Sequence, residues 1–238
     1  SVLVVRSPKV IGIDVGQGDA TLILVDRIAI LIDTGGISYL GDPIAKNTIM
    51  PVLRYYGINA LDYVVITHTD LDHIGGLKYL MNNVSIQQVI SAVPIDYVDD
   101  ELLISQFFML KGADYSIHLL NPWLYHHALS NNDRSIVSLI KLYDWQFLLT
   151  GDLDEMAEIS LIKHHLIPEV DVIKMGHHGS KTSTSAELLM ATNPRFAWNS
   201  AGRNNWYGHP HPLTLKRLDD RGVDYLSTDR HGAIMFHV

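Results

Sequence analysis

Residues 63–73 read YVVITHTDLDH and join a mostly apolar run to a cluster of polar side chains. The apolar run at 63–67 predicts a short buried strand. Four side chains that can bind a metal follow within six residues, and these are His68, Asp70, Asp72 and His73. Without a cation, such groups held close together would repel and desolvate one another. The stretch therefore predicts a metal site at a strand end, and the alternative is an exposed polar loop with two capping Asp residues.

Four more polar residues directly follow apolar runs that predict strands: Asp33, Asp152 and the pair His177 and His178. Taken singly, Asp152 would be a helix N-cap, the two histidines surface residues and Asp33 a turn-forming residue before two glycines. Functional side chains are commonly placed where a loop leaves a rigid strand. One shared metal site explains these positions together better than separate local roles do.

The composition excludes several classes of protein. The chain has no Cys, which removes disulfides, zinc fingers, Cys nucleophiles and iron–sulfur clusters. Its net charge of −8 disfavours a purely cationic nucleic-acid binder, so a nucleic-acid substrate would need metal ions or a local basic patch. The 238 residues are 47% hydrophobic and contain no linker or repeat, which predicts one domain over residues 1–238. No apolar run approaches the roughly 20 residues of a membrane span, and we expect a soluble domain of a larger protein.

Short apolar runs alternate with amphipathic stretches along the chain, which predicts two sheets packed together and flanked by helices. Strands are predicted at residues 10–15, 20–25, 28–32, 63–67, 135–143, 146–150, 170–175 and 196–199. Helices are predicted at residues 47–56, 77–81, 99–110, 154–164, 186–190 and 212–221.

The order of these motifs resembles the metallo-β-lactamase superfamily over residues 11–236. The motifs are DTG at 33–35, HTDLDH at 68–73, TGD at 150–152 and HHGS at 177–180. More narrowly, DVGQGDA at 14–20 and GRNNWYGHP at 202–210 resemble the C-terminal domain of ComEC-type competence proteins, which are membrane channels for DNA uptake. The resemblance implies an α+β fold, a four-layer αββα sandwich, with a site for two divalent metals between its sheets.

The resemblance also implies which residues act. It gives seven candidate ligands: His68, Asp70, Asp72, His73, Asp152, His177 and His178. The first two hold one metal, the next two hold the other, Asp152 bridges both, and His177 completes the second site with His178 as the alternative. A hydroxide shared by the two metals would attack a phosphodiester without any Ser or Cys nucleophile. The catalytic residues would be Asp72, Asp152 and His209, with His209 as proton donor or phosphate ligand and an ordinary loop His as its alternative.

The chain departs from the superfamily pattern at the first metal. Asp70 stands where the superfamily usually has His, and a further His is missing near NNDRS at 131–135, where Asn132 matches an Asn of ComEC-type domains. A carboxylate in place of imidazole favours Mn²⁺ or Mg²⁺ over Zn²⁺, so Mn²⁺ is the expected metal and Zn²⁺ the alternative. His126 and His127 lie nearby but outside the pattern, and we expect them to be surface residues.

Other polar residues suit phosphate handling or support of the ligands. The candidate substrate-binding residues are Asn132, Ser180, Lys181, Thr182, Arg203, Asn204, Tyr207 and His209. The hydroxyls near 180 have ordinary N-capping as an equal alternative. The residues expected to support the ligands from behind are Gln17, Asp19 and Asp33.

The function implied by the resemblance is a metal-dependent nuclease that degrades the non-transforming DNA strand during natural transformation. Its partners would be DNA, single-stranded or duplex, and the membrane channel portion of the parent protein, with nothing to indicate an obligate oligomer. The parent would lie in the inner membrane with this domain on its outer, periplasmic side. One alternative is a small-molecule hydrolase such as a phosphorylcholine esterase or lactonase relative. Another is a metal-poor domain that guides DNA without cleaving it.

Overall fold

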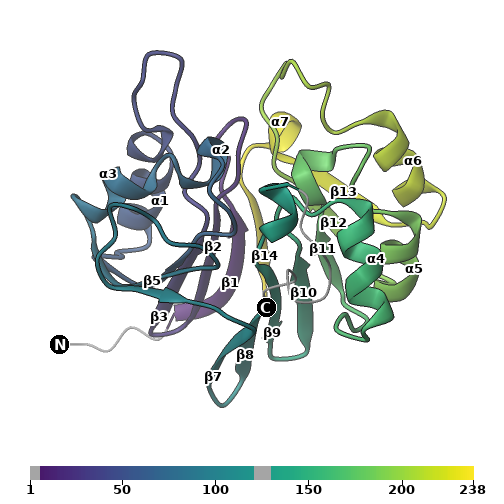
Figure 1. Cartoon of the computed structure of the whole chain (residues 1–238), viewed down its shortest axis with the longest axis horizontal. Helices are drawn as coiled ribbons and strands as arrows, with labels where there is room; N and C mark the ends of the chain where they lie inside the picture. The colour runs from purple at the N-terminus through teal and green to yellow at the C-terminus, as the bar shows by residue number, and fades with distance from the viewer. Residues whose placement is uncertain (1–5, 121–129) are drawn as a thin grey trace.

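Two seven-stranded sheets form the centre of this computed structural model, which describes residues 6–120 and 130–238 (Figure 1). The first sheet has the order β14-β1-β2-β3-β4-β5-β6, and the second has the order β13-β12-β11-β10-β9-β8-β7. The strands of the first sheet are β1 (Arg6–Gly12), β2 (Thr21–Asp26), β3 (Ile28–Ile32), β4 (Ala60–Val65), β5 (Ser85–Ser91), β6 (Glu101–Leu103) and β14 (Ile234–His237). Those of the second are β7 (Phe107–Lys111), β8 (Tyr115–Leu120), β9 (Val137–Leu142), β10 (Trp145–Leu149), β11 (Val172–Lys174), β12 (Phe196–Asn199) and β13 (Asp224–Ser227).

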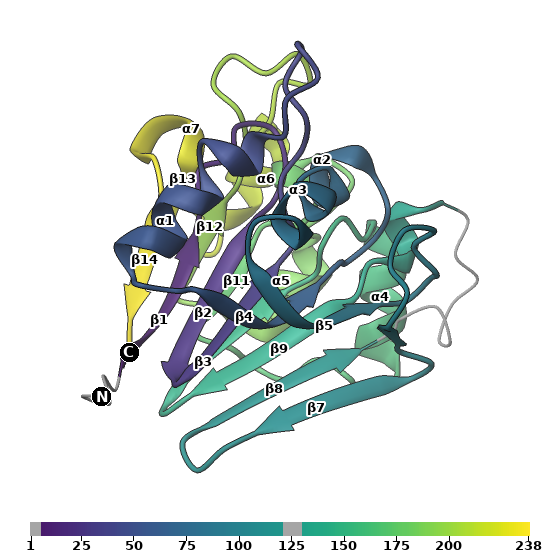
Figure 2. The same ribbon diagram turned by 90° about the vertical axis from the view of Figure 1, so that its left-hand side faces the viewer.

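Helices cover the outer face of each sheet (Figures 1 and 2). The first sheet carries η1 (Ile44–Lys46), α1 (Ile49–Tyr55), α2 (Leu71–Ile74) and α3 (Leu77–Met81). The second half carries η3 (Asn132–Arg134), α4 (Glu155–Lys163), η4 (Gly176–Gly179), α5 (Ala186–Thr192), α6 (Pro212–Asp219) and α7 (Thr228–His231). Within the described residues, each helix is too short or too polar to cross a bilayer.

The central strands are mostly apolar because both of their faces are buried. Leu22 and Leu24 of β2 and Leu31 of β3 face the helices of the first half, in a cluster with α1 and α3. Their neighbours Ile23 and Ile30 face the other sheet and share a second cluster with it. A third cluster lies between the second sheet and α4 to α6. Three apolar layers between four structural layers confirm the predicted αββα sandwich.

A glycine in the first sheet leaves room for a buried indole of the second sheet. A Cβ atom on Gly12 of β1 would lie 2.8 Å from Nε1 of Trp198, a fully buried side chain of β12. Any larger residue at position 12 would therefore push the indole out of the layer between the sheets.

The strand directions determine where the polar loops meet. In the first sheet β3, β4 and β5 run parallel, and in the second sheet β10, β11, β12 and β13 run parallel. Parallel strands end at the same edge of a sheet, so the loops that follow them lie together. Figure 1 places this edge at the top of the seam between the two halves, beside α2.

The prediction of a helix at residues 99–110 was wrong. This segment forms β6 and β7, which belong to different sheets. In β7 the exposed residues Phe107 and Met109 alternate with the half-buried Phe108 and Leu110, a period of two that favours a strand. The strands β5, β8, β13 and β14 were not predicted, whereas the hairpin of β9 and β10 is confirmed.

Candidate metal centre

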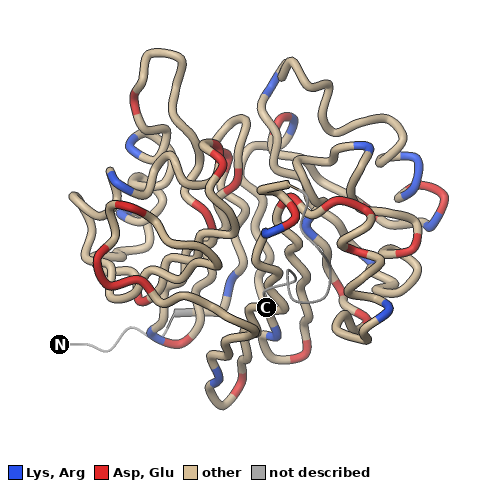
Figure 3. The backbone as a smooth tube through the Cα atoms, viewed as in Figure 1, with Lys and Arg blue, Asp and Glu red and all other residues tan. Residues whose placement is uncertain are grey.

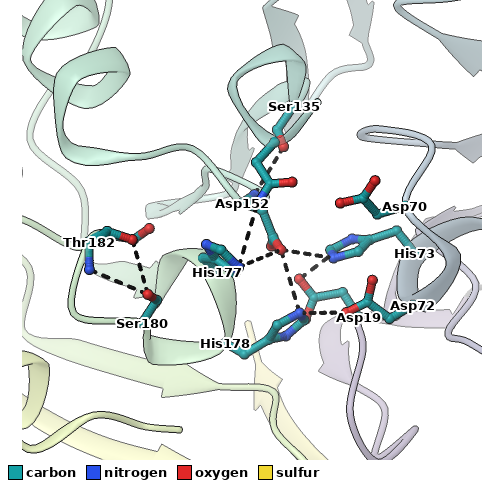
Figure 4. Close-up of polar contacts among 12 residues, drawn as sticks. Asp19, Asp70, Asp72, His73, Ser135, Asp152, His177, His178, Ser180 and Thr182 are labelled. Carbon is teal, nitrogen blue, oxygen red and sulfur yellow. Dashed lines mark hydrogen bonds and ion pairs between the residues drawn. The ribbon is translucent and has the colours of Figure 1, made fainter. Parts of the chain in front are cut away.

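Side chains from both halves of the molecule converge at the top of the seam (Figure 4). His73 comes from α2, Asp152 from the loop after β10, and His178 from η4 after β11. Nε2 of His73 lies 3.3 Å from Oδ2 of Asp152, and Nε2 of His178 lies 3.5 Å from the same oxygen. Nε2 of His178 also lies 3.1 Å from Oδ2 of Asp72. Asp152 is thus flanked by imidazoles that are distant in sequence.

The potential ligand atoms form overlapping groups in which all atoms lie within 4.8 Å of one another. One group is His68, His73 and Asp152, and another is Asp72, His73 and His178. Two further groups bring in Asp19 beside Asp152 and His178, and Asp19 with Asp33 beside His73. Overlap of this kind is what a two-metal site with a shared carboxylate requires.

The donor atoms fit a metal because several are buried with no hydrogen-bond partner among the described residues. These atoms are Nε2 of His68, Nε2 of His73, Oδ1 of Asp152 and Oδ1 of Asp19. A buried polar atom without a partner costs about 1–3 kcal/mol, so a cluster of them points to a ligand at that position. Imidazole nitrogen and carboxylate oxygen are donors that divalent Mn²⁺ and Zn²⁺ accept.

The second nitrogen of each buried imidazole is held by a neighbour. Nδ1 of His73 lies 2.8 Å from Oδ2 of Asp33, whose oxygens also accept from the backbone N–H and hydroxyl of Thr67. Nδ1 of His178 lies 3.0 Å from the carbonyl oxygen of Ser200. A donor bond from Nδ1 leaves Nε2 free and directed inward, which is how ligand histidines are usually oriented. Asp33 therefore contacts the candidate ligand His73 at the ring nitrogen opposite the one that faces Asp152.

Ser135 links two of the candidate ligands and was missed by the sequence analysis. Its hydroxyl lies 3.2 Å from Nδ1 of His68 and accepts from the backbone N–H of Asp152 at 3.0 Å. The residue belongs to the NNDRS stretch at 131–135, which the resemblance singled out only for Asn132.

Asp70 is the most exposed of the candidate ligands and is held by Asn131, to which the sequence analysis gave no role. Its side chain is 44% exposed, and Oδ2 lies 3.6 Å from Nε2 of His68. Asn131, and not Asn132, donates to Oδ1 of Asp70 at 2.6 Å. The contacts with His68 and Asn131 lower the pKa of Asp70 to about 2. Asn132 instead lies 3.5 Å from Nε2 of His177.

The adjacent histidines are placed differently. The side chain of His178 is 2% exposed and that of His177 is 30% exposed. Nε2 of His177 lies 3.8 Å from Oδ2 of Asp152, farther than Nε2 of His178. Both residues have left-handed backbone, with φ of 47° and 54°, a conformation that is costly outside glycine and concentrates at functional sites.

Lys174 is a buried cation that the sequence analysis overlooked. It is 2% exposed, pairs through Nζ with Oδ2 of Asp19, and donates to the carbonyl of Met175 at 3.3 Å. A lone Lys in an apolar strand was the available signal. The centre thus gathers one Lys and five carboxyl groups, from Asp19, Asp33, Asp70, Asp72 and Asp152. With neutral imidazoles these groups carry a net charge of −4, which two divalent cations would neutralise.

The packing of imidazoles against carboxylates shifts the pKa of both. Burial alone would raise the pKa of Asp152, but His73 and His178 hold it well below its usual range. Burial would lower the pKa of His178, but Asp152 and Asp19 raise it to about 10. A cation at this position would displace the imidazole protons, since metal ligation requires the neutral ring.

A series of ring contacts leads from the centre to the loop at 202–210. The rings of His177 and His209 are 6.0 Å apart, and those of His209 and Tyr207 are 5.7 Å apart and nearly parallel. Burial and the neighbouring His178 and His177 lower the pKa of His209 to about 4, and its Nδ1 is buried without a hydrogen-bond partner among the described residues. Asn205 closes the loop, because its side chain donates to the carbonyl oxygens of Gly202 and His209 and accepts from the backbone N–H of His209.

Several residues predicted to bind substrate or to support the ligands contact other parts of the chain instead. Gln17 accepts from the backbone N–H of Gly202 and so fixes the same loop. Nε of Arg203 donates to the carbonyl of Asp229. Ser180 and Thr182 bond to each other on the far side of His177 (Figure 4).

Three remaining predictions have separate outcomes. Lys181 and Asn204 are exposed, and within the described part of the chain their side chains make no contact with the candidate ligands. The N-cap of α5 is Ser185, so the capping alternative for residues 180–182 does not apply to that helix. His126 and His127 lie outside the described residues.

Glu158 supports the centre from the outer layer. This fully buried carboxyl group on α4 accepts from the backbone N–H of Thr184 at 2.7 Å and of Ser185 at 2.9 Å. It therefore ties α4 to the segment that follows η4. Burial raises its pKa to about 7 despite these donors and the nearby Arg217, which favour the ionised form.

We expect Glu158 to make stability fall as the pH rises. Its native pKa of about 7 exceeds the ordinary value of 4.5, so the folded state holds the proton more tightly. The stabilisation is complete below pH 4.5 and lost by about pH 7, in total about 3 kcal/mol. Denaturant unfolding of the metal-free protein from pH 4.5 to 8 should show the advantage of wild type over Glu158→Gln shrinking across this window. A constant difference between the two proteins would contradict the assignment.

The chain is similar to several known proteins. The family model described as "Metallo-beta-lactamase superfamily" matches residues 13–202. The chain is 32% identical over 252 residues to ComE operon protein 3 of Bacillus subtilis, covering 94% of this chain and 32% of that protein. It is 31% identical over 224 residues to competence protein ComA of Neisseria gonorrhoeae, covering 94% of this chain and 31% of that protein. The chain thus spans about a third of the length of these relatives.

A solved structure shares the fold. The metallo-beta-lactamase fold protein YhfI of Bacillus subtilis superposes with a TM-score of 0.63, covering 98% of this chain and 100% of that one, at 10% sequence identity. At that identity the likeness concerns the backbone arrangement alone.

Proposed function

Because the chain belongs to the metallo-β-lactamase superfamily, we propose that it is a metal-dependent phosphodiesterase domain that cleaves DNA. The observation that carries the proposal is the convergence of buried His and Asp side chains whose inward-facing atoms have no hydrogen-bond partner among the described residues. Such a cluster is suited to binding cations, and two-metal sites are a recurrent solution for phosphodiester hydrolysis.

The residues divide the work as follows. One cation would be held by His68, His73 and Asp152, with Asp70 beside it. The other would be held by Asp72 and His178, together with either His73 or Asp152. Two such cations supply charge stabilisation and water activation for attack on a phosphorus centre.

The chain's own groups orient that reaction. Asp33 and Ser200 fix the ring orientation of His73 and His178, so the ligand atoms are in place before substrate binds. The partly exposed Asp70, Asp72 and His177 mark the open side, where a phosphate can approach. His209 borders this side and could hydrogen-bond a phosphate oxygen through a ring N–H.

The biological role we propose is degradation of the non-transforming strand during DNA uptake. It is supported by the similarity to two proteins of competence systems over most of this chain. The rest of a longer parent would supply the membrane channel and present the DNA, with this domain on the outer side of the inner membrane. The parent's channel would compensate for the net charge of −8, which weakens binding of free DNA.

A cleavage assay tests the function. The metal-stripped protein is given Mn²⁺ and offered end-labelled single-stranded and duplex DNA, with bis(p-nitrophenyl) phosphate as a small ester. Metal-dependent DNA cleavage supports the proposal. Turnover of small esters alone favours the small-molecule hydrolase, and neither metal uptake nor turnover favours a DNA-guiding domain.

We expect Mn²⁺ to support higher turnover than Zn²⁺. The reason is Asp70, a carboxylate beside the His68 cluster where the superfamily usually has imidazole, because carboxylate ligands favour Mn²⁺. Reconstitution of wild type and Asp70→His with each metal measures the effect, and the substitution should move the preference toward Zn²⁺. Full activity of wild type with Zn²⁺ and none with Mn²⁺ would refute the argument.

A further inference from the structure

A pocket of about 480 Å³ opens beside the metal centre, and we propose that it is a nucleobase subsite that makes single-stranded DNA the substrate. The inference rests on the proposed function and extends it to the form of DNA that is bound. The residues that matter for the argument are Ile37, Thr69, Leu71, Lys78, Asp96 and Tyr97. A volume of this size lies within the roughly 300–1,000 Å³ typical of small-ligand sites.

The pocket shares its wall with the ligand loop. Thr69 and Leu71 line it, and they alternate with the candidate ligands Asp70 and Asp72. On the other side, Ile37 follows Gly36, where an added Cβ would lie 3.3 Å from Cα of Asp72. A group bound in the pocket is therefore a near neighbour of a phosphate held at the metals, as the base of one nucleotide is to its own phosphate.

The residues that line the pocket suit a flat aromatic base that is linked to a negatively charged phosphate. Tyr97 is 40% exposed, Leu71 59% and Ile37 38%, so apolar and aromatic faces are available to a ligand. Nζ of Lys78 lies over the Tyr97 ring, 5.7 Å from its centroid, so a base would stack on the opposite aromatic face. Stacking on an aromatic side chain is how proteins bind bases without reading their sequence, and Lys adds attraction for phosphate.

Charge also favours a single strand over a duplex. Duplex binding depends on neutralising many phosphates, whereas this chain has a net charge of −8. Figure 3 shows acidic positions at α2 and across the seam, with basic positions dispersed over both halves. A base inside a duplex is stacked and paired and cannot enter a pocket, whereas a base in a single strand is free to do so.

The experiment compares an oligothymidylate with the same strand built of abasic tetrahydrofuran units, both end-labelled. Wild type should cleave the base-containing strand with about tenfold higher kcat/KM. Tyr97→Ala should reduce this ratio to near one because only the base-containing strand can stack on the ring, and Tyr97→Phe should retain the ratio because the aromatic face remains. Tyr39→Ala is the matched control, since Tyr39 is fully exposed two residues beyond Ile37 and does not line the pocket.

Three results would overturn the subsite: equal cleavage of both strands by wild type, an equal loss on both strands in Tyr97→Ala, or faster cleavage of duplex than of single strand. A second measurement separates this inference from the proposed function. With metal chelated, fluorescence anisotropy gives the affinities for the same two strands in the absence of cleavage. A base preference that depends on Tyr97 there supports the subsite even if the protein cleaves no DNA, and the absence of preference in both measurements rejects it.

Discussion

Asp152→Ala is expected to lose bound metal and at least about a thousandfold of its turnover, because several kcal/mol of charge stabilisation disappear together with the cations. Oδ2 of Asp152 lies within 4 Å of the Nε2 atoms of His73, His177 and His178, so its loss affects both candidate sites at once. Metal content by elemental analysis and kcat/KM on the cleaved strand measure the two effects.

Asp154→Ala is the matched control for this variant. Asp154 lies two residues further along the same loop, and its side chain caps α4 by accepting from the backbone N–H of Ala157. Its removal should cost about 1 kcal/mol of stability and leave metal content unchanged. If Asp152→Ala keeps its full complement of metal, the centre is not where we place it. If it loses metal but retains turnover, the chemistry does not use the metal.

His178→Ala and His177→Ala are expected to differ sharply. The buried His178 has Nε2 3.1 Å from Asp72 and Nδ1 anchored on the Ser200 carbonyl, the arrangement of a fixed ligand. We expect its removal to reduce metal content by about one ion per chain and turnover by two to three orders of magnitude, roughly the effect of losing a directly coordinating group.

The side chain of the neighbouring His177 is 30% exposed and lies farther from Asp152, so His177→Ala should retain both ions and lose less turnover. Because the two positions are adjacent, each variant controls for damage to η4 in the other. Stoichiometry and affinity from calorimetric titration with Mn²⁺ separate the cases. A larger loss of metal and turnover in His177→Ala than in His178→Ala would make His177 the ligand, which is what the family resemblance implies.

Much of the site could be predicted because strand direction decides it. Apolar runs that end in Asp33, His68, Asp152 and His177 can be read from the sequence. In the structure β3 and β4 are parallel, as are β10 and β11, so these runs end at a common edge. Local pattern and the rules of parallel sheets therefore suffice to predict which loops meet.

The rest depends on side-chain direction and on contacts between distant segments. Asn131 and Asn132 are adjacent in a short turn, and only the structure shows that Asn131 contacts Asp70. The partner of Lys174 is Asp19, which lies on a loop of the other half of the molecule. The ion pair could therefore not be predicted from the sequence around either residue. The helix expected at residues 99–110 failed for a related reason, because strand pairing with separate sheets outweighed local propensity there.

Because the candidate metal centre lies between the two halves of the molecule, bound metal affects the lifetime of the folded domain. His73 and Asp72 belong to one half, and Asp152 and His178 belong to the other, so a cation bound between them clasps the two halves together. A ligand that binds only the folded form stabilises it by about 2.7 kcal/mol when its free concentration is a hundredfold above its Kd. Scarcity of the metal would then lower the abundance of the domain as well as its activity, since a chain that opens along the seam is exposed to proteases.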